Sequence, residues 1–437
     1  MSESLPIQPI GRFCSALRLP GSKSLTNRAL LLAALSSQGA TLTGVLFADD
    51  TRVMIDALNA MGFALVIDEG SQRVVSPRCA QTMSAEHVQL QLGNAGTAFR
   101  FLTAACCLNR GGSQYILDGN DRMRQRPIGQ LVDALRQIGA KIDYLGSTGF
   151  PPLCVHSTGL KGGDLRMPTT LSSQFISALL MVGPACEQGL RIHFDGPITS
   201  RPYVQMTLEL MKKFGVTTNV TPEFSSIQIQ PAAYRGIDYS IEPDASNASY
   251  FLAAAAIVPA SKCTIQGLGR GSLQGDVGFA DVLHTMGAGL LYGDDFITVM
   301  GLPATQRLRG IDVDLNTMPD MSQTLAAVAL FADQPTALRN IGNLRVKETD
   351  RLFALKTELG KLGAAVKIDG DDLTIEPPPS HAIRPAVIDT YDDHRMAMSF
   401  AIIGLRSPGI RINDPHCVRK TFPDYFEYLG KLGEASL

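Results

Sequence analysis

Apolar and polar residues follow one another along the chain in an order that recurs six times. Each copy has a polar loop, a helix of small apolar residues, a strand-like run and an amphipathic helix that ends at an apolar residue followed by glycine. These ends are Met61-Gly62, Ile138-Gly139, Phe214-Gly215, Met286-Gly287, Leu362-Gly363 and Leu432-Gly433, so the glycines recur every 70 to 77 residues. A period of this size predicts one supersecondary module used six times.

The predicted helices of small apolar residues each open with polar residues. These openings lie at 24–28, 93–97, 172–174, 244–247, 320–323 and 392–395. Between the helices, the runs 114–117, 190–194 and 364–368 have strand character. The alternation predicts an α/β protein in which six modules divide into two sets of three, with the break between Gly215 and Asn247.

Composition narrows the class of protein. A chain of 437 residues is too long for one small core, so two domains are expected. The net charge of −2 argues against a bulk electrostatic grip on nucleic acid or on an anionic membrane. No apolar run approaches the ~20 residues of a membrane span, and residues 1–20 lack the apolar core of a signal peptide. The eight cysteines form no C-x-x-C pair, so we expect reduced thiols and a cytoplasmic protein.

The first candidate for chemistry is the segment Leu19–Ser24. It is similar to a phosphate-binding loop but fails the Walker A pattern, because Ser22 stands before Lys23 where that pattern requires glycine. An ATP-dependent kinase is therefore disfavoured. Lys23, Ser24 and Arg28 still begin a helix, whose N-terminal N–H groups favour anions. A serine cap with solvated cations is the alternative interpretation.

Further candidates are clusters of small or charged residues. Glycine lets the backbone at 93–97 approach a ligand closely, and three arginines at 122–126 could bind phosphate or carboxylate. In the segment 343–351 we expect Lys347 and Arg351 to share the face of a helix that begins there, beside Glu348. This arrangement suits acid–base work on an anion. Each cluster alone also fits an ordinary turn, a solvated loop or a salt-bridged helix face.

Taken together, these segments resemble the 5-enolpyruvylshikimate-3-phosphate (EPSP) synthase family of enolpyruvyl transferases. The matching stretches are LPGSKS and NRALLLAAL within 19–35, LGNAGTA at 92–98, RM-x-x-RPIG-x-LVDAL at 122–135, SSQF at 172–175, the NRVKETDR-like run at 343–351, DHRMAM at 393–398 and KTFPDYFE at 420–427. They run in unbroken order from the first predicted strand to the last predicted helix.

The resemblance implies a two-domain inverted α/β barrel-like fold with six repeats of a βαβαββ unit, three per domain. It places the N-terminal lobe at 22–242 and the C-terminal lobe at 1–21 plus 243–437, with the active site in the cleft between them. The implied reaction transfers the enolpyruvyl group of phosphoenolpyruvate to the 5-hydroxyl of shikimate 3-phosphate, in the shikimate pathway towards chorismate and aromatic amino acids. It implies no metal and no organic cofactor, no nucleic-acid or membrane partner, and a monomer.

The resemblance also assigns roles to single residues. Lys23, Asp320 and Glu348 would be catalytic, with Asp320 as the base near the 5-hydroxyl and Glu348 protonating the methylene carbon. Phosphoenolpyruvate would be bound by Lys23, Gly96, Arg122, Gln174, Arg351, Arg395 and Lys420. Arg122 and Lys420 would hold its phosphate, and Arg351 and Arg395 its carboxylate. Shikimate 3-phosphate would be bound by Lys23, Ser24, Arg28, Ser172, Ser173, Gln174, Ser200, Tyr203, Asp320, Asn343 and Lys347.

The sequence departs from the family pattern at a few positions. Phe99 and Phe101 stand where the family commonly has Met and Pro, Asp392 replaces a common Asn, and Asn247 a common Ser. Gly96 predicts sensitivity to glyphosate, which occupies the phosphoenolpyruvate site in this family. Phe101 works against this, because a shifted helix could push Gly96 towards the ligand; we still expect inhibition.

Three other functions compete with this interpretation. A sister enzyme that uses a UDP-amino sugar shares the fold, but its usual loop cysteine has no counterpart at 122–126. A non-catalytic anion-binding protein would be expected to lack Asp320 or Glu348, and both are present. An enzyme that processes nucleic-acid ends fits poorly with the near-neutral charge.

Overall fold

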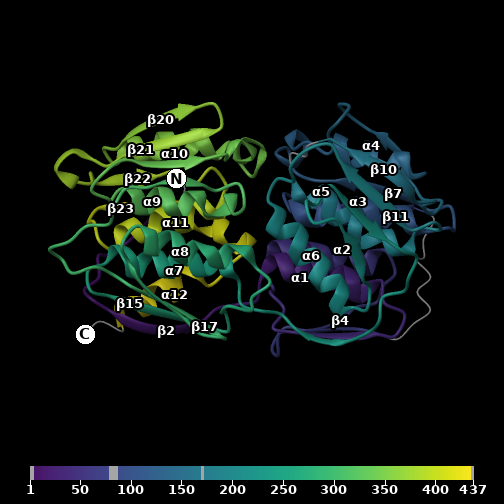
Figure 1. Ribbon diagram of the computed structural model, residues 1–437, viewed down its shortest axis with the longest axis horizontal. Coiled ribbons are helices and arrows are strands. Elements are labelled where there is room, and N and C mark those ends of the chain that lie inside the picture. Colours follow the sequence, from purple (N-terminus) through teal and green to yellow (C-terminus); the bar gives the residue numbers. More distant parts are fainter. Residues whose placement is uncertain (1–3, 78–86, 169–171, 435–437) are drawn as a thin grey trace. The chain divides into compact units, whose positions relative to one another are not determined.

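The computed structural model describes residues 4–77, 87–168 and 172–434, and these residues form two compact units. One unit comprises 21–241; the other comprises 1–20 together with 242–437. Figure 1 shows helices and strands alternating through both units. We call them the central unit (21–241) and the terminal unit (1–20 with 242–437).

The central unit is built from three successive modules. The first contains α1 (Lys23–Ala34), β3 (Ala40–Thr43), α2 (Asp49–Ala60), β4 (Val66–Asp68) and β5 (Arg73–Ser76). The second contains β6 (His87–Gln91), α3 (Gly96–Ala105), η1 (Cys106–Leu108), β7 (Gln114–Asp118), η2 (Met123–Gln125), α4 (Gly129–Gln137), β8 (Lys141–Tyr144) and β9 (Leu153–His156). The third contains β10 (Gly163–Met167), α5 (Ser173–Val182), η3 (Gly183–Ala185), β11 (Leu190–Phe194), α6 (Arg201–Lys213), β12 (Thr218–Val220) and β13 (Ser226–Ile229), and β14 (Asp238–Ser240) follows.

The terminal unit begins with β1 (Ser4–Pro6) and β2 (Cys14–Arg18) and resumes at residue 242. Its first module has α7 (Ala245–Ile257), β15 (Lys262–Gln266), η4 (Gly275–Gly278), α8 (Phe279–Thr285), β16 (Gly289–Tyr292) and β17 (Phe296–Met300). The next has β18 (Asp312–Asp314), η5 (Pro319–Met321), α9 (Ser322–Ala329), β19 (Thr336–Arg339), η6 (Gly342–Val346), α10 (Arg351–Lys361), β20 (Ala365–Asp369) and β21 (Asp372–Glu376). The last has η7 (Pro379–His381), β22 (Ala386–Ile388), α11 (His394–Gly404), β23 (Ile410–Asn413), η8 (Pro415–Lys420) and α12 (Tyr425–Glu434).

Five sheets share one topology. In each, a parallel pair of strands is extended by an antiparallel hairpin, as in β6-β7-β9-β8, β10-β11-β13-β12, β14-β3-β5-β4, β2-β15-β17-β16 and β18-β19-β21-β20. The sixth sheet has three strands, β22-β23-β1, and β1 lies where the other sheets have a hairpin strand. The repeated βαβαββ module is therefore present, with its last copy completed by the N-terminal strand.

In two of these sheets, the first strand is not the strand that directly precedes the first helix of the module in sequence. β2 precedes α1 in sequence but pairs in parallel with β15, with Cys14 opposite Lys262. β14 precedes α7 but pairs in parallel with β3, with Asp238 opposite Thr41. The chain thus passes from one unit to the other twice, at 20–21 and 241–242. At each passage, the last strand before the crossing pairs with a strand of the unit that the chain leaves.

The helices of small apolar residues form the cores of both units. All six openings predicted from sequence do begin helices, namely α1, α3, α5, α7, α9 and α11. The helices are almost wholly buried; in α7 every residue except Ser246 is buried. Small side chains allow such helices to pack closely. Each Å² of apolar surface that they remove from water stabilises the fold by ~25 cal/mol.

Five of the six predicted helix ends are confirmed. Gly62, Gly139, Gly215, Gly287 and Gly363 all have a left-handed backbone, with φ between 84° and 111°, just after α2, α4, α6, α8 and α10. A glycine accepts this conformation without steric cost and reverses the chain into the hairpin that follows. The sixth prediction is wrong: α12 continues through Gly433 to Glu434. None of the helices in these described ranges has the length and apolarity to cross a membrane.

Candidate active site

The site residues predicted from sequence fall into two groups, one in each unit. In the central unit they lie at or near the N-terminal ends of α1, α3, α5 and α6 and beside η2: Lys23, Ser24, Arg28, Gly96, Arg122, Ser172, Ser173, Gln174, Ser200 and Tyr203. In the terminal unit they lie at or near the starts of α9, α10, α11 and α12: Asp320, Asn343, Lys347, Glu348, Arg351, Arg395 and Lys420.

Arg28 is the most deeply buried cation of the central unit, with 2% of its surface exposed. Its guanidinium donates hydrogen bonds to Thr207 Oγ1 (2.8 Å), to Ser177 Oγ (3.2 Å) and to the carbonyls of Ser24 and Tyr203. All of these acceptors are neutral, and among the described residues no carboxylate contacts the guanidinium. Burial lowers the pKa of Arg28 to about 10, because it disfavours the charged form. A buried cation without an anionic partner is suited to bind one.

Lys23 is the first residue of α1 and lies close to Asp50 of α2. Its Nζ is 3.2 Å from Asp50 Oδ2, and the Asp50 side chain is only 4% exposed. The helix begins here because the Ser22 side chain accepts a hydrogen bond from the N–H of Leu25 and so caps the first turn. The capped first turn of α1 thus carries Lys23, and Arg28 lies further along the same helix.

The loop that opens α3 brings two further arginines to Gly96. Arg100 donates to the Gly96 carbonyl (3.1 Å), and Arg126 donates to Asn94 Oδ1 (2.9 Å) and to the Asn94 carbonyl (3.2 Å). A Cβ on Gly96 would lie 2.5 Å from Arg126 Nη2 and 2.9 Å from Arg100 Nη1. Gly96 is therefore in direct contact with two guanidinium groups, and only glycine leaves room for them.

Arg122, which the resemblance assigns to the phosphate of phosphoenolpyruvate, lies just before η2. Its Nη1 donates to Gln125 Oε1 at 3.3 Å, and its residue is only half-buried. Arg126 is 4% exposed and faces the Gly96 loop. The short helix η2 lies between Arg122 and Arg126. Arg126 contacts the helix start at Gly96, and the role of Arg122 in holding phosphate stays a prediction.

The start of α5 is joined to the start of α3. Gln174 Nε2 donates to Thr97 Oγ1 at 3.2 Å, and the Ser172 side chain caps α5 by accepting from the N–H of Gln174. Ser173 is buried beside them. Ser200 precedes α6 with a left-handed backbone, φ 53°, and its side chain makes no capping hydrogen bond.

In the terminal unit the centre of the group is Arg351, which is 1% exposed. Its Nε and Nη2 donate to the two oxygens of Asp393, at 2.7 and 3.1 Å, and Nη2 also donates to Glu348 Oε2 at 3.0 Å. Its Nη1 donates to Asp320 Oδ1 at 3.1 Å. Burial alone would lower the pKa of Arg351, but the three carboxylates raise it above its ordinary value.

Asp320 connects this arginine to two more cations. Arg395 Nη2 donates to Asp320 Oδ2 at 3.1 Å, and Lys347 Nζ lies 3.6 Å from Oδ1. Burial alone would raise the pKa of Asp320, but Arg395, Lys347 and Arg351 hold it well below its usual range. The carboxyl is therefore ionised at neutral pH.

One local prediction for this group is wrong. Lys347 does not lie on the helix of Arg351: it has an extended backbone, and α10 begins only at Arg351. The reason is Asp350, whose side chain accepts a hydrogen bond from the N–H of Phe353 and so caps the helix at that point. Lys347 and Arg351 nevertheless meet at the same atom, Asp320 Oδ1.

The remaining predicted residues lie around Glu348, which is 8% exposed. Lys420, at the end of η8, places its Nζ 4.0 Å from Glu348 Oε1. Asn343 lies on η6, and its Oδ1 is buried without a hydrogen-bond partner among the described residues. An unpaired buried carbonyl oxygen is costly unless a ligand or water satisfies it.

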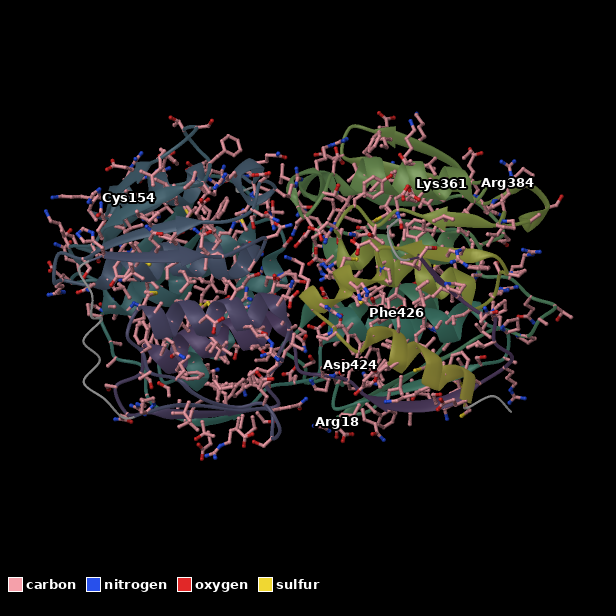
Figure 2. All side chains as sticks on the ribbon, turned by 180° about the vertical axis from the view of Figure 1, so that it is seen from behind. Arg18, Cys154, Lys361, Arg384, Asp424 and Phe426 are labelled. Atoms are coloured by element: carbon pink, nitrogen blue, oxygen red, sulfur yellow. The ribbon has the colours of Figure 1, made fainter. Side chains whose placement is uncertain are left out.

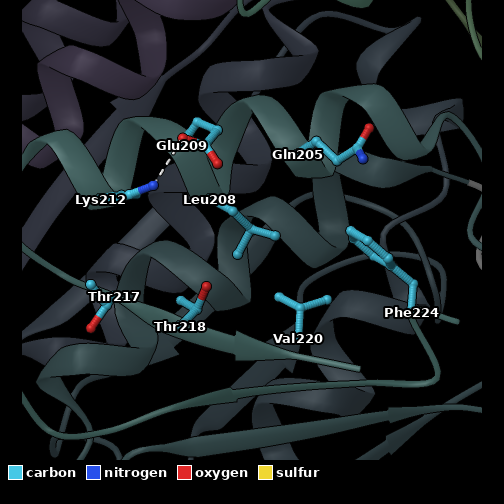
Figure 3. Close-up of a pocket in the computed structure, with 8 residues that line it drawn as sticks. All are labelled: Gln205, Leu208, Glu209, Lys212, Thr217, Thr218, Val220 and Phe224. Carbon is cyan, nitrogen blue, oxygen red and sulfur yellow. Dashed lines mark ion pairs between the residues drawn. The ribbon is translucent and has the colours of Figure 1, made fainter. Parts of the chain in front are cut away.

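A hollow of about 400 Å³ lies elsewhere, between α6 and the strand β12 of the central unit (Figure 3). It is lined by Gln205, Leu208, Glu209, Lys212, Thr217, Thr218, Val220 and Phe224, none of them a predicted site residue. Its two charges, Glu209 and Lys212, face one another at 3.9 Å. It offers no net charge to an anionic ligand, so it is not the candidate site.

Four residues that contact the two groups were given no individual role from sequence: Asp50, Arg100, Arg126 and Asp393. Arg100 had a signal in the repeat, since it follows Gly96 by four residues as Arg28 follows Ser24, and both donate to the carbonyl four residues back. The carboxylates had no local signal, because their partners are distant in sequence. Within the described residues, no three His, Cys, Asp or Glu side chains are grouped so as to hold a metal ion.

Comparisons with known proteins bear on the whole chain. Residues 7–429 match a family described as EPSP synthase (3-phosphoshikimate 1-carboxyvinyltransferase). The chain is 46% identical over 438 residues to a 3-phosphoshikimate 1-carboxyvinyltransferase from Vibrio vulnificus and 47% identical over 435 residues to one from Aeromonas salmonicida. In both comparisons the match covers 99% of this chain and 99% of the relative.

Solved structures show the same fold. An EPSP synthase from Acinetobacter baumannii superposes with a TM-score of 0.81 at 24% identity, covering 99% of this chain and 98% of that one. The enolpyruvyl transferase NikO from Streptomyces tendae superposes with a TM-score of 0.77 at 20% identity, covering 99% and 98%. The two-unit α/β fold expected from sequence is confirmed. On the match over 7–429 and the full-length relatives at 46–47% identity, the chain belongs to the EPSP synthase family.

Proposed function

We propose that this protein transfers the enolpyruvyl group of phosphoenolpyruvate to the 5-hydroxyl of shikimate 3-phosphate, releasing inorganic phosphate, in the shikimate pathway. The relatives at 46–47% identity carry the name of this activity. The structural observation that carries the proposal is Arg28, a buried cation whose contacts are all to neutral groups. The two substrates together bring about five negative charges at neutral pH, and they require cations of this kind.

The central unit suits the acceptor. We assign the shikimate carboxylate to Arg28 and Ser24, with Lys23 beside them, and the 3-phosphate to Ser172, Ser173, Ser200 and Tyr203. Bare or serine-capped helix starts supply N–H groups that favour a phosphate. Gln174 is assigned to both ligands. The phosphate of phosphoenolpyruvate is assigned to Arg122, and Arg126, which is buried and in contact with the Gly96 loop, is a second candidate for it.

The terminal unit suits the donor and the proton transfers. Arg351 and Arg395 are assigned to the carboxylate of phosphoenolpyruvate and Lys420 to its phosphate. Asn343 and Lys347 are assigned to the acceptor near its 5-hydroxyl, and the buried, unpaired Oδ1 of Asn343 supports this. The residues that we assign to the two substrates thus come from both units.

The reaction proceeds by addition and elimination. In the addition, the 5-oxygen bonds to C2 of phosphoenolpyruvate, Asp320 accepts the hydroxyl proton and Glu348 gives a proton to the methylene carbon. In the elimination, the bond from C2 to the phosphate oxygen breaks, a proton returns from the methyl group to Glu348, and the proton held by Asp320 leaves with the phosphate. The product is an enolpyruvyl ether, and phosphate is the leaving group.

The cations around Asp320 offer a way to time the first proton transfer. In the free protein Arg395, Lys347 and Arg351 keep the pKa of Asp320 low, so it is ionised but a weak base. Arg351 and Arg395 are also the groups assigned to the donor carboxylate. When they turn part of their charge to that carboxylate, the pKa of Asp320 rises and it becomes a better proton acceptor.

The test is phosphate release from phosphoenolpyruvate with shikimate 3-phosphate, run beside UDP-N-acetylglucosamine as the alternative acceptor. We expect release with the first acceptor only; release with the sugar nucleotide alone would assign the chain to the sister activity. Glu348→Gln should bind both ligands yet lower kcat by ~10²-fold or more. The control is Glu209→Gln, an exposed carboxylate of the hollow on α6. Equal kcat in both variants would remove Glu348 from the mechanism.

Further properties of the family complete the proposal. We propose a cytoplasmic monomer that acts on small molecules, without a nucleic-acid partner and without a metal or organic cofactor. Glyphosate should inhibit it in competition with phosphoenolpyruvate. Full activity in millimolar glyphosate at low phosphoenolpyruvate would contradict this.

A further inference from the structure

The segment before α11 holds an unusual backbone. Tyr391 and Asp392 are both left-handed, with φ of 56° and 53°, although neither is glycine. Side chains with a Cβ rarely adopt this conformation, and two in succession persist only where the surroundings hold them. The next residue is Asp393, which caps α11 and binds Arg351, and Arg395 follows two positions later.

Glu358 binds the segment 389–393, which precedes α11, although it lies on a different helix. It lies on α10, is 0% exposed, and accepts hydrogen bonds from the Tyr391 hydroxyl (2.7 Å) and from the N–H of Asp389 (3.0 Å). Lys361, labelled in Figure 2, closes the arrangement with its Nζ 2.7 Å from Glu358 and 2.8 Å from Asp389. A buried carboxylate that is bound by three donors has little freedom to move.

The same helix holds the other end of the segment. Arg351 is the first residue of α10 and binds both oxygens of Asp393, while Glu358 follows seven residues later, two turns along the same face. Asp393 Oδ1 also accepts the N–H of Arg395 at 2.9 Å. The position of Arg395 relative to Arg351 is thus set by a segment clamped to α10 at both ends.

We propose that Glu358, acting through Tyr391, is a positioning residue that keeps Arg351 and Arg395 at the spacing needed to bind one carboxylate. The inference rests on the proposed function, in which these arginines hold the carboxylate of phosphoenolpyruvate. Neither Glu358 nor Tyr391 is among the residues that we assign to a substrate. When the clamp is loosened, the two left-handed residues relax, and the start of α11 moves with them.

The test compares two tyrosine variants of the same unit. Tyr391→Phe removes the hydroxyl bound to Glu358, and Tyr292→Phe removes a hydroxyl that donates to the Val277 carbonyl and to Asp281, on other elements of the unit. We expect Tyr391→Phe to raise KM for phosphoenolpyruvate about tenfold, with KM for shikimate 3-phosphate unchanged. Tyr292→Phe should leave both KM values unchanged at a similar loss of stability.

Two glutamate variants grade the effect. Glu358→Gln keeps one carbonyl oxygen as an acceptor and should raise KM for phosphoenolpyruvate less than Glu358→Ala does. A wild type that releases no phosphate would overturn the proposed function, and the inference with it. If the wild type is active, equal KM values in the two tyrosine variants, or equal increases for both substrates, would overturn the inference alone.

Discussion

Arg28 of the central unit and Arg351 of the terminal unit are both buried, at 2% and 1% exposed, yet their surroundings are opposite. Arg351 binds Asp393, Glu348 and Asp320. Arg28 binds hydroxyls and carbonyls, and its guanidinium lies over the ring of Phe101, with 5.2 Å from Cζ to the ring centroid. One cation is neutralised by the protein; the other is left for a ligand to neutralise.

The helix starts of the two units differ in the same way. In the central unit the caps of α1, α3 and α5 are Ser22, Ala95 and Ser172, all without charge. In the terminal unit the caps of α7, α10 and α11 are Asp244, Asp350 and Asp393, whereas α9 has the uncharged cap Met321. An acidic cap competes with an anionic ligand for the N–H groups of the first turn, whereas a neutral one leaves the positive helix end available. The central unit is therefore prepared for an anion, and the terminal unit must exchange partners to accept one.

Removal of Arg351 should have the largest effect. Arg351→Met leaves the buried carboxylate of Asp393 without its main partner, and breaking a buried ion pair in this way costs about 3–5 kcal/mol. The free energy of unfolding in urea should fall by that amount. The control is Lys356→Met, an exposed lysine on the same helix. A loss no larger than in the control would mean that the carboxylates of the terminal unit do not depend on Arg351.

The matched change in the central unit should have the opposite sign for stability. Arg28→Met removes a buried charge without stranding an anion, and Ser177 and Thr207 keep a hydrogen bond to each other at 2.8 Å. We expect the free energy of unfolding to rise by about 1–2 kcal/mol. KM for shikimate 3-phosphate should rise ~30-fold or more, since a charge-assisted contact is lost. Destabilisation as large as in Arg351→Met would erase the contrast between the units.

The repeat made much of this architecture predictable. Six helix openings and five helix ends were found from sequence because small apolar residues and a following glycine are local signals. The pairing of β14 with β3 had no such signal, since three residues at 238–240 do not specify a partner almost 200 positions away. The continuation of α12 through Gly433 to Glu434 likewise had no local signal in the repeat.

The sequence indicated which types of residue form the candidate site better than it indicated where each of them lies in the structure. Lys347 was placed on a helix because the capping role of Asp350 was not recognised. The contact between Arg126 and Gly96 depends on the turn at Met123–Gln125, which the spacing of the arginines at 122–126 does not specify. Ion pairs such as Lys23–Asp50 depend on tertiary packing, which a single sequence does not record.

A third experiment tests whether the central unit also prepares a place for the donor phosphate. In Gly96→Ala the new Cβ would lie 2.5 Å from Arg126 Nη2 and 2.9 Å from Arg100 Nη1, so both guanidinium ends must move. These are the ends of flexible side chains, so stability should change little. KM for phosphoenolpyruvate should rise about tenfold, which corresponds to ~1.4 kcal/mol. The control is Gly93→Ala, where no atom lies within 4 Å of the new Cβ but φ is 52°. That variant should lose stability without the same change in KM.

The smallest expected effect is a change in stability with pH that differs between the two units. The pKa of Asp320 is held below its ordinary value near 3.8, so its ionised form stabilises the fold above the unfolded-state pKa, and this stability is lost as the pH falls towards the lower, folded-state pKa. Asp320→Asn should cost only about 1 kcal/mol at neutral pH, because Glu348 and Asp393 still pair with Arg351 and the amide oxygen of Asn can still accept from Arg395. The difference from wild type should be constant between pH 5 and 8 and shrink below about pH 4.

Arg28 supplies the opposite case for the same titration. Its pKa, lowered to about 10, lies far above this range, so the stability difference between wild type and Arg28→Met should stay level from pH 8 down to pH 4. Asp121→Asn, whose side chain is 96% exposed, serves as the control for general acid effects. If the Asp320→Asn difference were level and the Arg28→Met difference changed with acid, the carboxylates that matter would lie beside Arg28. The central unit would then be the one with its charges already paired.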